Sequence, residues 1–259
     1  MKGAQFSAVI KWGSWEIKGP VHLFRERMIV NNLRKHLSQG RILDAGCGTG
    51  SLALQLGFLG YTVLGVDSSL DCVYAARRKV AKSGLSDRII IYQGNVAVLG
   101  LGHAKFDGIV CGEVLEHLRD DKSAVKGFNH TLREDGICVV TVPANPKLWS
   151  EVDVYAGHVR RYTSSQLSYL FKSHGFQVMH LKYWGFPIIR LYQRLLFRPY
   201  MLRMRHRDTA LQLWDMITRV GSNGLVPIVL SKLFQLDSLF GQLPWGIGLL
   251  IVAKKCTDV

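Results

Sequence analysis

A short apolar run leads into three closely spaced glycines in ILDAGCGTG, residues 42–50. Glycines let the backbone turn tightly at positive φ, and they leave room for a ligand to lie against the main chain. An apolar run before this turn and a helix-forming segment after it predict a strand, a turn and a helix. Such a unit is typical of α/β proteins that bind ligands at the carboxyl ends of their strands.

From residue 41 onward, β-rich runs alternate with segments of helical period. Strands are predicted at 41–46, 61–67, 88–95, 106–113 and 137–143, and helices at 51–60, 68–84, around 114–118 and at 122–136. Two further strands are expected at 175–185 and 246–255. Strands separated by helices predict a parallel sheet with right-handed crossovers. We therefore expect an α/β, doubly wound fold with a seven-stranded, mostly parallel sheet.

The chain is expected to form a single domain, 1–259, because it contains neither an internal repeat nor a Ser/Pro/Gly-rich linker. Its expected parts are an N-terminal helical segment (1–40), a cofactor-binding core (41–145), a substrate loop with a helix and the sixth strand (146–183), a basic amphipathic helical insertion (184–245) and the last strand (246–255). A capping-box pattern, TSSQ at 163–166, predicts where the helix after the loop begins.

Composition narrows the class of protein. Hydrophobic residues make up 48% of the 259 residues, which excludes collagen-like and disordered chains. Thirty-three basic residues against 19 acidic ones give a net charge of +14, which favours contact with nucleic acid or an anionic membrane. Five cysteines without a CxxC pair predict free thiols in a reducing compartment, and no leader or uninterrupted spanning segment is evident. We expect a cytoplasmic protein.

The residues around the glycine turn indicate the ligand. Ser51 stands where a dinucleotide fingerprint, GxGxxG, has its last glycine, and Asp44 precedes the turn. A carboxylate repels pyrophosphate but attracts a ligand with ammonium and sulfonium charges. Asp67 ends the second strand, where it can accept ribose hydroxyls. The alternatives are that Asp44 caps the adjacent loop and that Asp67 caps the helix after it.

Together these motifs resemble those of class I S-adenosylmethionine-dependent methyltransferases, in the small-molecule and lipid branch that includes ubiquinone O-methyltransferases. LDAGCGTG, GVDSS, QGNV and FDGIVCGEVLEHL are similar to four successive family motifs. Asn95 departs from the family, which usually has Asp there, although its amide oxygen can still accept a hydrogen bond from adenine. The resemblance implies S-adenosylmethionine as cofactor and these cofactor-binding residues: Asp44, Gly46, Cys47, Gly48, Gly50, Asp67, Ser68, Asn95, Val96 and Glu113.

Two histidines are candidates for a general base, His117 after the fourth strand and His158 in the loop after the fifth. The segment GHVRRYT at 157–163 resembles a signature of one methyltransferase branch, in which this loop covers the active site. Alternatively, its arginines pair with local acids and His158 caps a turn. The expected substrate-binding residues are Trp149, Asp153, Tyr155, Arg160, Arg161 and Tyr162.

The segment GEVLEH also raises the question of a metal. Glu113, Glu116 and His117 would share one face of a helix, and the segment resembles the metal-associated part of ubiquinone-pathway O-methyltransferases. Metal-free relatives carry the same letters, with the Glu and His orienting the loop. We therefore expect no metal.

Residues 187–210 combine arginines with an apolar stripe. Such a helix can lie in a membrane interface, pack on the core or bind RNA phosphates, and peripheral contact with the anionic inner face of a membrane is the favoured interpretation. The arginines are Arg190, Arg194, Arg198, Arg203, Arg205 and Arg207, and the apolar residues are Leu191, Leu195, Leu196, Phe197 and Leu202.

The predicted function is the transfer of a methyl group to an oxygen of a small-molecule or lipid-like acceptor. One alternative is an RNA methyltransferase, which the net charge suggests. Against it, the fourth strand ends in CGEVLEH rather than in an Asn/Asp-Pro-Pro-aromatic motif, and no RNA-binding module is appended. An NAD-dependent oxidoreductase conflicts with the glycine spacing, and a non-catalytic S-adenosylmethionine-binding protein stays open.

Overall fold

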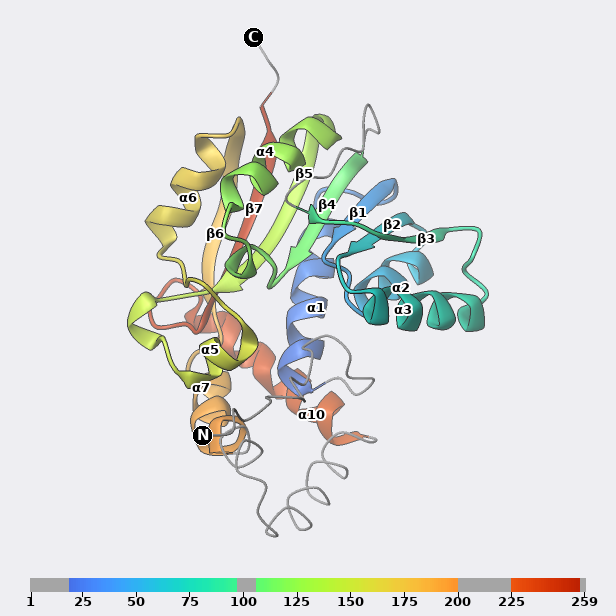
Figure 1. Cartoon of the computed structure of the whole chain (residues 1–259). Coiled ribbons are helices and arrows are strands. Elements are labelled where there is room, and N and C mark those ends of the chain that lie inside the picture. Colours follow the sequence, from blue (N-terminus) through green and yellow to red (C-terminus); the bar gives the residue numbers. More distant parts are fainter. Residues whose placement is uncertain (1–18, 97–105, 200–224, 257–259) are drawn as a thin grey trace, which may run out of the picture.

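A computed structural model describes residues 19–96, 106–199 and 225–256 (Figure 1). Within them lies one seven-stranded sheet with the order β3-β2-β1-β4-β5-β7-β6. β7 is antiparallel to both of its neighbours, and the other strands run parallel, which confirms the predicted fold. The strands are β1 (Arg41–Ala45), β2 (Thr62–Asp67), β3 (Ile89–Gln93), β4 (Phe106–Gly112), β5 (Leu132–Pro143), β6 (Phe176–Trp184) and β7 (Gly248–Lys255).

Helices cover both faces of the sheet, so the central strands are apolar throughout. One apolar core lies between the sheet and α1 (Pro20–Arg34), α2 (Ser51–Phe58) and α3 (Leu70–Ser83). A second core lies on the opposite face, beneath α4 (Asp121–Thr131) and α6 (Ser164–Lys172). Figure 1 shows α4 and α6 together on one side, with α1 running behind the ends of β4 and β5.

Local signals in the sequence define several helix ends. The Ser69 side chain caps the start of α3, and Gly84 ends that helix in the left-handed conformation. Thr163 and Gln166 form the predicted capping box of α6. Side-chain oxygens at these positions accept hydrogen bonds from backbone N–H groups that the helix leaves unpaired.

Two helical predictions are wrong in extent. The helix expected at 122–136 ends at Thr131, because Leu132 already pairs with Phe106 in the sheet and buries its side chain. The helix expected around 114–118 is a single 3-10 turn, η2 (Leu115–His117). The chain becomes extended at Leu118, whose carbonyl accepts a hydrogen bond from the Arg160 guanidinium.

The predicted substrate loop that follows β5 contains two short helical segments, η3 (Pro146–Leu148) and α5 (Glu151–Ala156). Ser150 and Asp153 form a capping box at the start of α5, and Gly157 ends it with φ 77°. The segment is too short for its sequence to show a helical period, and its capping residues define where α5 begins and ends.

The described part of the insertion consists of α7 (Ile188–Tyr192), the π-helical η4 (Gln193–Phe197), α10 (Leu225–Leu233) and the 3-10 helix η5 (Phe234–Phe240). Ile189 and Phe234 bury their side chains in the core beside α1. Leu202, Arg203, Arg205 and Arg207 lie outside the described residues. None of the described helices is both long and apolar enough to cross a membrane.

Candidate active site

The glycine turn between β1 and α2 is held in place by the end of β2. The N–H groups of Gly46 and Cys47 both donate to the Val66 carbonyl. Asp67 accepts from the Gly48 N–H at 2.8 Å through one carboxylate oxygen, and from the Ser69 N–H at 2.9 Å through the other. Asp67 thus joins the glycine turn to the start of α3, while Ser69 is the residue that caps that helix.

The three glycines of the turn serve different purposes, although φ is positive at each: 76° at Gly46, 53° at Gly48 and 78° at Gly50. A Cβ at Gly46 would lie 2.3 Å from the Val114 side chain, and one at Gly50 would lie 2.9 Å from Ala76. A Cβ at Gly48 would meet no protein atom within 4 Å. Packing therefore excludes side chains at Gly46 and Gly50, whereas Gly48 borders open space that a ligand could fill.

Asp44 lies at the floor of this turn with an unsatisfied oxygen. Asp44 is 1% exposed, and its Oδ2 has no hydrogen-bond partner in the part of the chain that the structure describes. Burial, followed by the charges of Glu26 and Asp67, raises its pKa to about 8. A buried, unpaired carboxyl group is costly unless a cation or a donor reaches it. The group therefore suits a ligand that carries an ammonium.

Helix α1 brings two charged residues, which no sequence motif indicated, to the carboxyl ends of the central strands: Glu26 beside the start of α2 and Arg25 beside the end of β4. Glu26 is 3% exposed and accepts hydrogen bonds from Ser51 and Gln55 on α2. Arg25 extends toward the end of β4, with its Nε 3.9 Å from where a Cβ on Gly112 would lie. An acidic residue on the apolar face of the predicted helix was the available signal for Glu26, but no local pattern indicated its partners.

The predicted adenine side of the site is only partly described. Ser68 and Asn95 are exposed at the ends of β2 and β3, and Val96 is buried. Residues 97–105, which follow Val96, lie outside the described residues. Ser68 and Asn95 thus lie at the surface, where β2 and β3 end.

Two acidic residues follow β4. Glu113 adopts a positive φ of 59°, unusual for a residue with a side chain, and its buried Oε1 makes no hydrogen bond to any residue that the structure describes. Glu116 is fully buried, and neither of its carboxyl oxygens has a hydrogen-bond partner among the described residues. Burial, followed by the charge of Glu113, raises the pKa of Glu116 well above its usual range.

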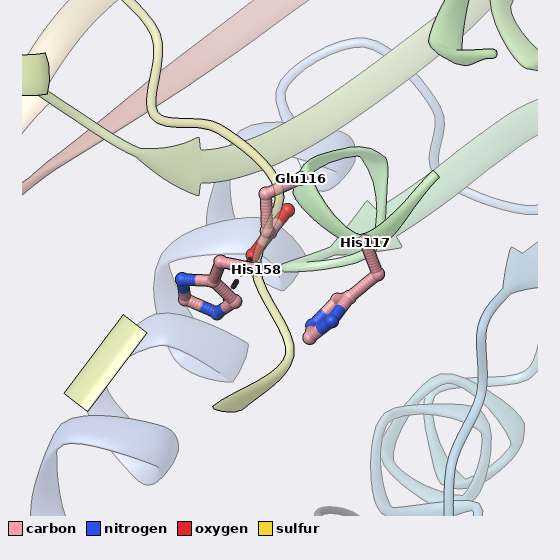
Figure 2. A group of neighbouring side chains, drawn as sticks. All are labelled: Glu116, His117 and His158. Carbon is pink, nitrogen blue, oxygen red and sulfur yellow. Dashed lines mark ion pairs between the residues drawn. The ribbon is translucent and has the colours of Figure 1, made fainter. Parts of the chain in front are cut away.

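Both candidate histidines lie beside Glu116 (Figure 2). Nε2 of His158 is 3.9 Å from Oε1 of Glu116, and the rings of His117 and His158 meet edge to face with centroids 4.8 Å apart. Nδ1 of His117 lies 3.3 Å from the Gly157 carbonyl oxygen, so it carries the hydrogen. Burial, followed by the charge of the neighbouring His158, lowers the pKa of His117.

The same three residues meet the spacing of a divalent-ion site, because one ligand atom from each lies within 4.8 Å of the others. This set differs from the helical face considered from the sequence, since His158 takes the place of Glu113. The turn η2 is too short to align Glu113 with His117 on one face.

The charged residues of the 157–163 loop point inward. Arg160 pairs with Asp121 at 2.8 Å, and the Tyr162 hydroxyl donates to the same carboxylate at 2.7 Å. Arg161 pairs with Asp153 at 2.7 Å. The pairing of the arginines with local acids, left open by the sequence, is thus present. These contacts clamp the loop onto η2 and thereby place His158 beside Glu116.

Two other predicted substrate residues stay at the surface of this loop. Trp149 is 43% exposed, and Tyr155 on α5 is half-buried. An aromatic face at the rim of a site can cover an apolar ligand and exclude water. Their contact with an acceptor remains a prediction.

A family model described as a methyltransferase domain matches residues 23–181. The chain belongs to this methyltransferase family. A related sequence is the ubiquinone biosynthesis O-methyltransferase of Glaesserella parasuis serovar 5 (strain SH0165), 30% identical over 156 residues that cover 56% of this chain and 65% of the relative. Other relatives with the same description are matched over 49% of their length, so the chain spans about half to two thirds of these methyltransferases.

Solved structures share the fold of this methyltransferase domain. Phosphoethanolamine N-methyltransferase 2 of Haemonchus contortus, in complex with S-adenosyl-L-methionine, has a TM-score of 0.65 at 15% identity, covering 96% of this chain and 56% of that one. The [4+2]-cyclase SpnF also has a TM-score of 0.65, at 17% identity, over 94% and 86% of the two chains. Because one neighbour is a cyclase, the fold alone does not specify the reaction.

Proposed function

We propose that the protein is an S-adenosylmethionine-dependent methyltransferase that transfers a methyl group to an oxygen of a small-molecule or lipid-like acceptor. The observation that carries this proposal is the buried Oδ2 of Asp44, which has no hydrogen-bond partner within the described residues, together with the open space at Gly48 in the same turn. Family membership and the relatives described as O-methyltransferases support the reaction and the acceptor atom.

The residues present fit S-adenosylmethionine. Asp44 and Glu26 offer carboxylates to its ammonium, and Arg25 offers a cation to its carboxylate. Gly48 leaves space for the methionine portion, and Asn95 and Val96, which follow β3, are the proposed contacts of the adenine. Asp67 already accepts two backbone hydrogen bonds, and each of its oxygens retains a second lone pair for a ribose hydroxyl.

Bound S-adenosylmethionine supplies an electrophilic methyl group. The protein then needs to orient an acceptor hydroxyl, exclude water and remove one proton. His158 and His117 are the available bases, and each has one ring nitrogen left without a hydrogen bond among the described residues. Trp149 and Tyr155 cover the acceptor side.

A labelling experiment tests the reaction. Purified protein receives methyl-labelled S-adenosylmethionine together with a cell lysate separated into lipid, small-molecule, RNA and protein fractions. We expect label in the lipid or small-molecule fraction, on an alkali-stable ether, and loss of labelling with Asp44→Asn. Label in RNA would contradict the acceptor class, and an absence of label in every fraction while the cofactor binds would contradict catalysis.

We further propose that the insertion docks on an anionic membrane, which would deliver a lipid-like acceptor. Exposed apolar side chains cover α7, η4, α10 and η5, and Arg194 and Arg198 are exposed among them. Figure 1 draws α5, α7 and α10 at the end to which β4 and β5 point. The apolar residues are Leu191, Leu195, Leu196, Val226, Ile228, Val229, Leu233, Leu236, Leu239, Phe240 and Trp245.

Vesicle flotation tests this contact. Leu236→Glu/Leu239→Glu should lose binding to phosphatidylglycerol vesicles, because it places two negative charges in the exposed apolar patch, one of them at Leu239, its most exposed residue. The matched control is Ile90→Glu, a similarly exposed apolar residue on the edge strand β3. If both variants bind the vesicles as well as the wild type does, the patch is not the docking surface. If the wild type binds neutral vesicles equally well, and does so at high salt, the docking does not depend on anionic lipid.

A further inference from the structure

Asp153 is the most constrained carboxylate of the substrate loop. It is 1% exposed, and its Oδ1 lies 2.9 Å from Nδ1 of His158 and 2.7 Å from Nε of Arg161. Its Oδ2 accepts from the Ser150 N–H at 2.8 Å. The side chain therefore lies inside the loop and touches the histidine rather than open space.

These contacts determine which nitrogen of His158 carries hydrogen. Burial alone would raise the pKa of Asp153, but hydrogen bonds from His158 and Arg161, with the charge of Arg161, lower it to about 2. An ionised carboxylate only accepts hydrogen bonds. Nδ1 of His158 must therefore be the N–H, and in the neutral ring Nε2 is the atom with a free lone pair.

The free nitrogen faces the unsatisfied part of the site. Nε2 of His158 lies 3.9 Å from Oε1 of Glu116, and neither oxygen of this carboxyl group has a hydrogen-bond partner among the described residues (Figure 2). At 3.9 Å the two groups do not bond directly, so a hydroxyl oxygen could contact both. The opposite tautomer would turn a donor toward this space and leave no base there.

We propose that Asp153 is a positioning residue that holds His158 in the Nδ1–H tautomer, so that Nε2 accepts the proton of the acceptor hydroxyl. This inference rests on the proposed function. As the acceptor oxygen bonds to the methyl carbon, its proton passes to Nε2, and the carbon–sulfur bond breaks with its electron pair kept on sulfur. The resulting imidazolium donates to Asp153 through Nδ1.

Asp153→Asn perturbs this arrangement with little change of shape. The amide must either present its NH2 group to the Ser150 N–H or turn it toward His158 and Arg161. The second orientation donates to Nδ1 and moves the ring hydrogen to Nε2. A matched control is Asp121→Asn, because Asp121 is also buried in this clamp but pairs with Arg160 and Tyr162 and bonds to neither histidine.

The test is ¹⁵N NMR of the histidine rings in the cofactor-free protein, recorded at a pH high enough that the ring signals no longer change with pH. The His158 signal is assigned by its loss in His158→Gln. We expect a protonated Nδ1 in the wild type and in Asp121→Asn, and a mixed or reversed tautomer in Asp153→Asn. A wild-type Nε2–H tautomer, or an unchanged one in Asp153→Asn, would overturn the inference.

Kinetics separate this inference from the proposed function. With a labelled acceptor in hand, Asp153→Asn should lower kcat at least tenfold, while the Kd for S-adenosylhomocysteine stays within about twofold. If Asp153→Asn shifts the tautomer of His158 and kcat does not change, the tautomer does not affect turnover, and the positioning role of Asp153 is refuted. If the wild type transfers no methyl group, the proposed function fails, whereas the tautomer result still decides what Asp153 does.

Discussion

Replacing Asp44 with Asn removes the carboxyl group at the floor of the glycine turn. The role of this group can be detected by counting the protons that the protein releases when the cofactor binds. With a pKa of about 8, about 0.9 of this group is protonated at pH 7. An ammonium about 4 Å away interacts with a carboxylate by about 4 kcal/mol at an effective dielectric constant near 20. Since about 1.4 kcal/mol corresponds to a tenfold change in the ionisation constant, this interaction energy lowers the pKa of Asp44 to below 7 when the ammonium is bound. Asp44 is then ionised at pH 7. Binding should therefore release about 0.9 of a proton.

Isothermal titration calorimetry measures this release. S-adenosylhomocysteine, which retains the ammonium group, is titrated at pH 7 in buffers of differing ionisation enthalpy, and the slope of the observed heat gives the number of protons released. We expect about one proton with the wild type and close to none with Asp44→Asn, which should also bind more weakly. The amide keeps the shape of the side chain, so packing is nearly unchanged.

The same group affects the free protein in a direction that can be checked. Its pKa in the folded state lies above its ordinary value of 3.8, so the folded state keeps a proton that the unfolded state loses. The stability contributed by this proton is present below about pH 4 and is lost as the pH rises toward 8. Asp44→Asn should flatten the fall of Tm over this window. Equal proton release by both proteins, with parallel Tm profiles, would refute the assignment of Asp44.

Three further outcomes are expected. Gly48→Ala should weaken cofactor binding at least tenfold while costing only about 1 kcal/mol of stability, whereas Gly46→Ala should destabilise the fold more, because its Cβ meets Val114; calorimetry and thermal melts separate the two. Tyr162→Phe should lower the free energy of unfolding by about 1–3 kcal/mol in urea melts without raising the KM for the acceptor, because its hydroxyl clamps the loop through Asp121. His158→Gln should lower kcat by roughly 100-fold and leave the Kd for S-adenosylhomocysteine unchanged, and normal turnover in this variant would leave His117 as the base.

The sequence by itself determined the elements whose signals are local. The strand, glycine turn and helix at 41–58 follow from an apolar run and three glycines at fixed spacing, and the ends of α3 and α6 follow from their capping residues. These signals are readable because a turn, a cap or a strand period involves residues a few positions apart. For the same reason, the sequence placed Asp44 and Asp67 at one edge of the sheet.

Tertiary structure alone decided how distant segments meet. Because α1 packs across the sheet, Glu26 reaches Ser51 and Gln55 beside the glycine turn, and Arg25 reaches the end of β4. No spacing in the sequence reveals either contact. Arg160, Arg161 and Tyr162, expected at the substrate, are turned inward by acids 8 to 41 positions away. The direction of these side chains depends on which buried acids lie within reach, and that is determined only once the chain has folded. The pKa of Asp44 and the tautomer of His158 depend on tertiary structure for the same physical reason, because desolvation and hydrogen bonds come from neighbours in space.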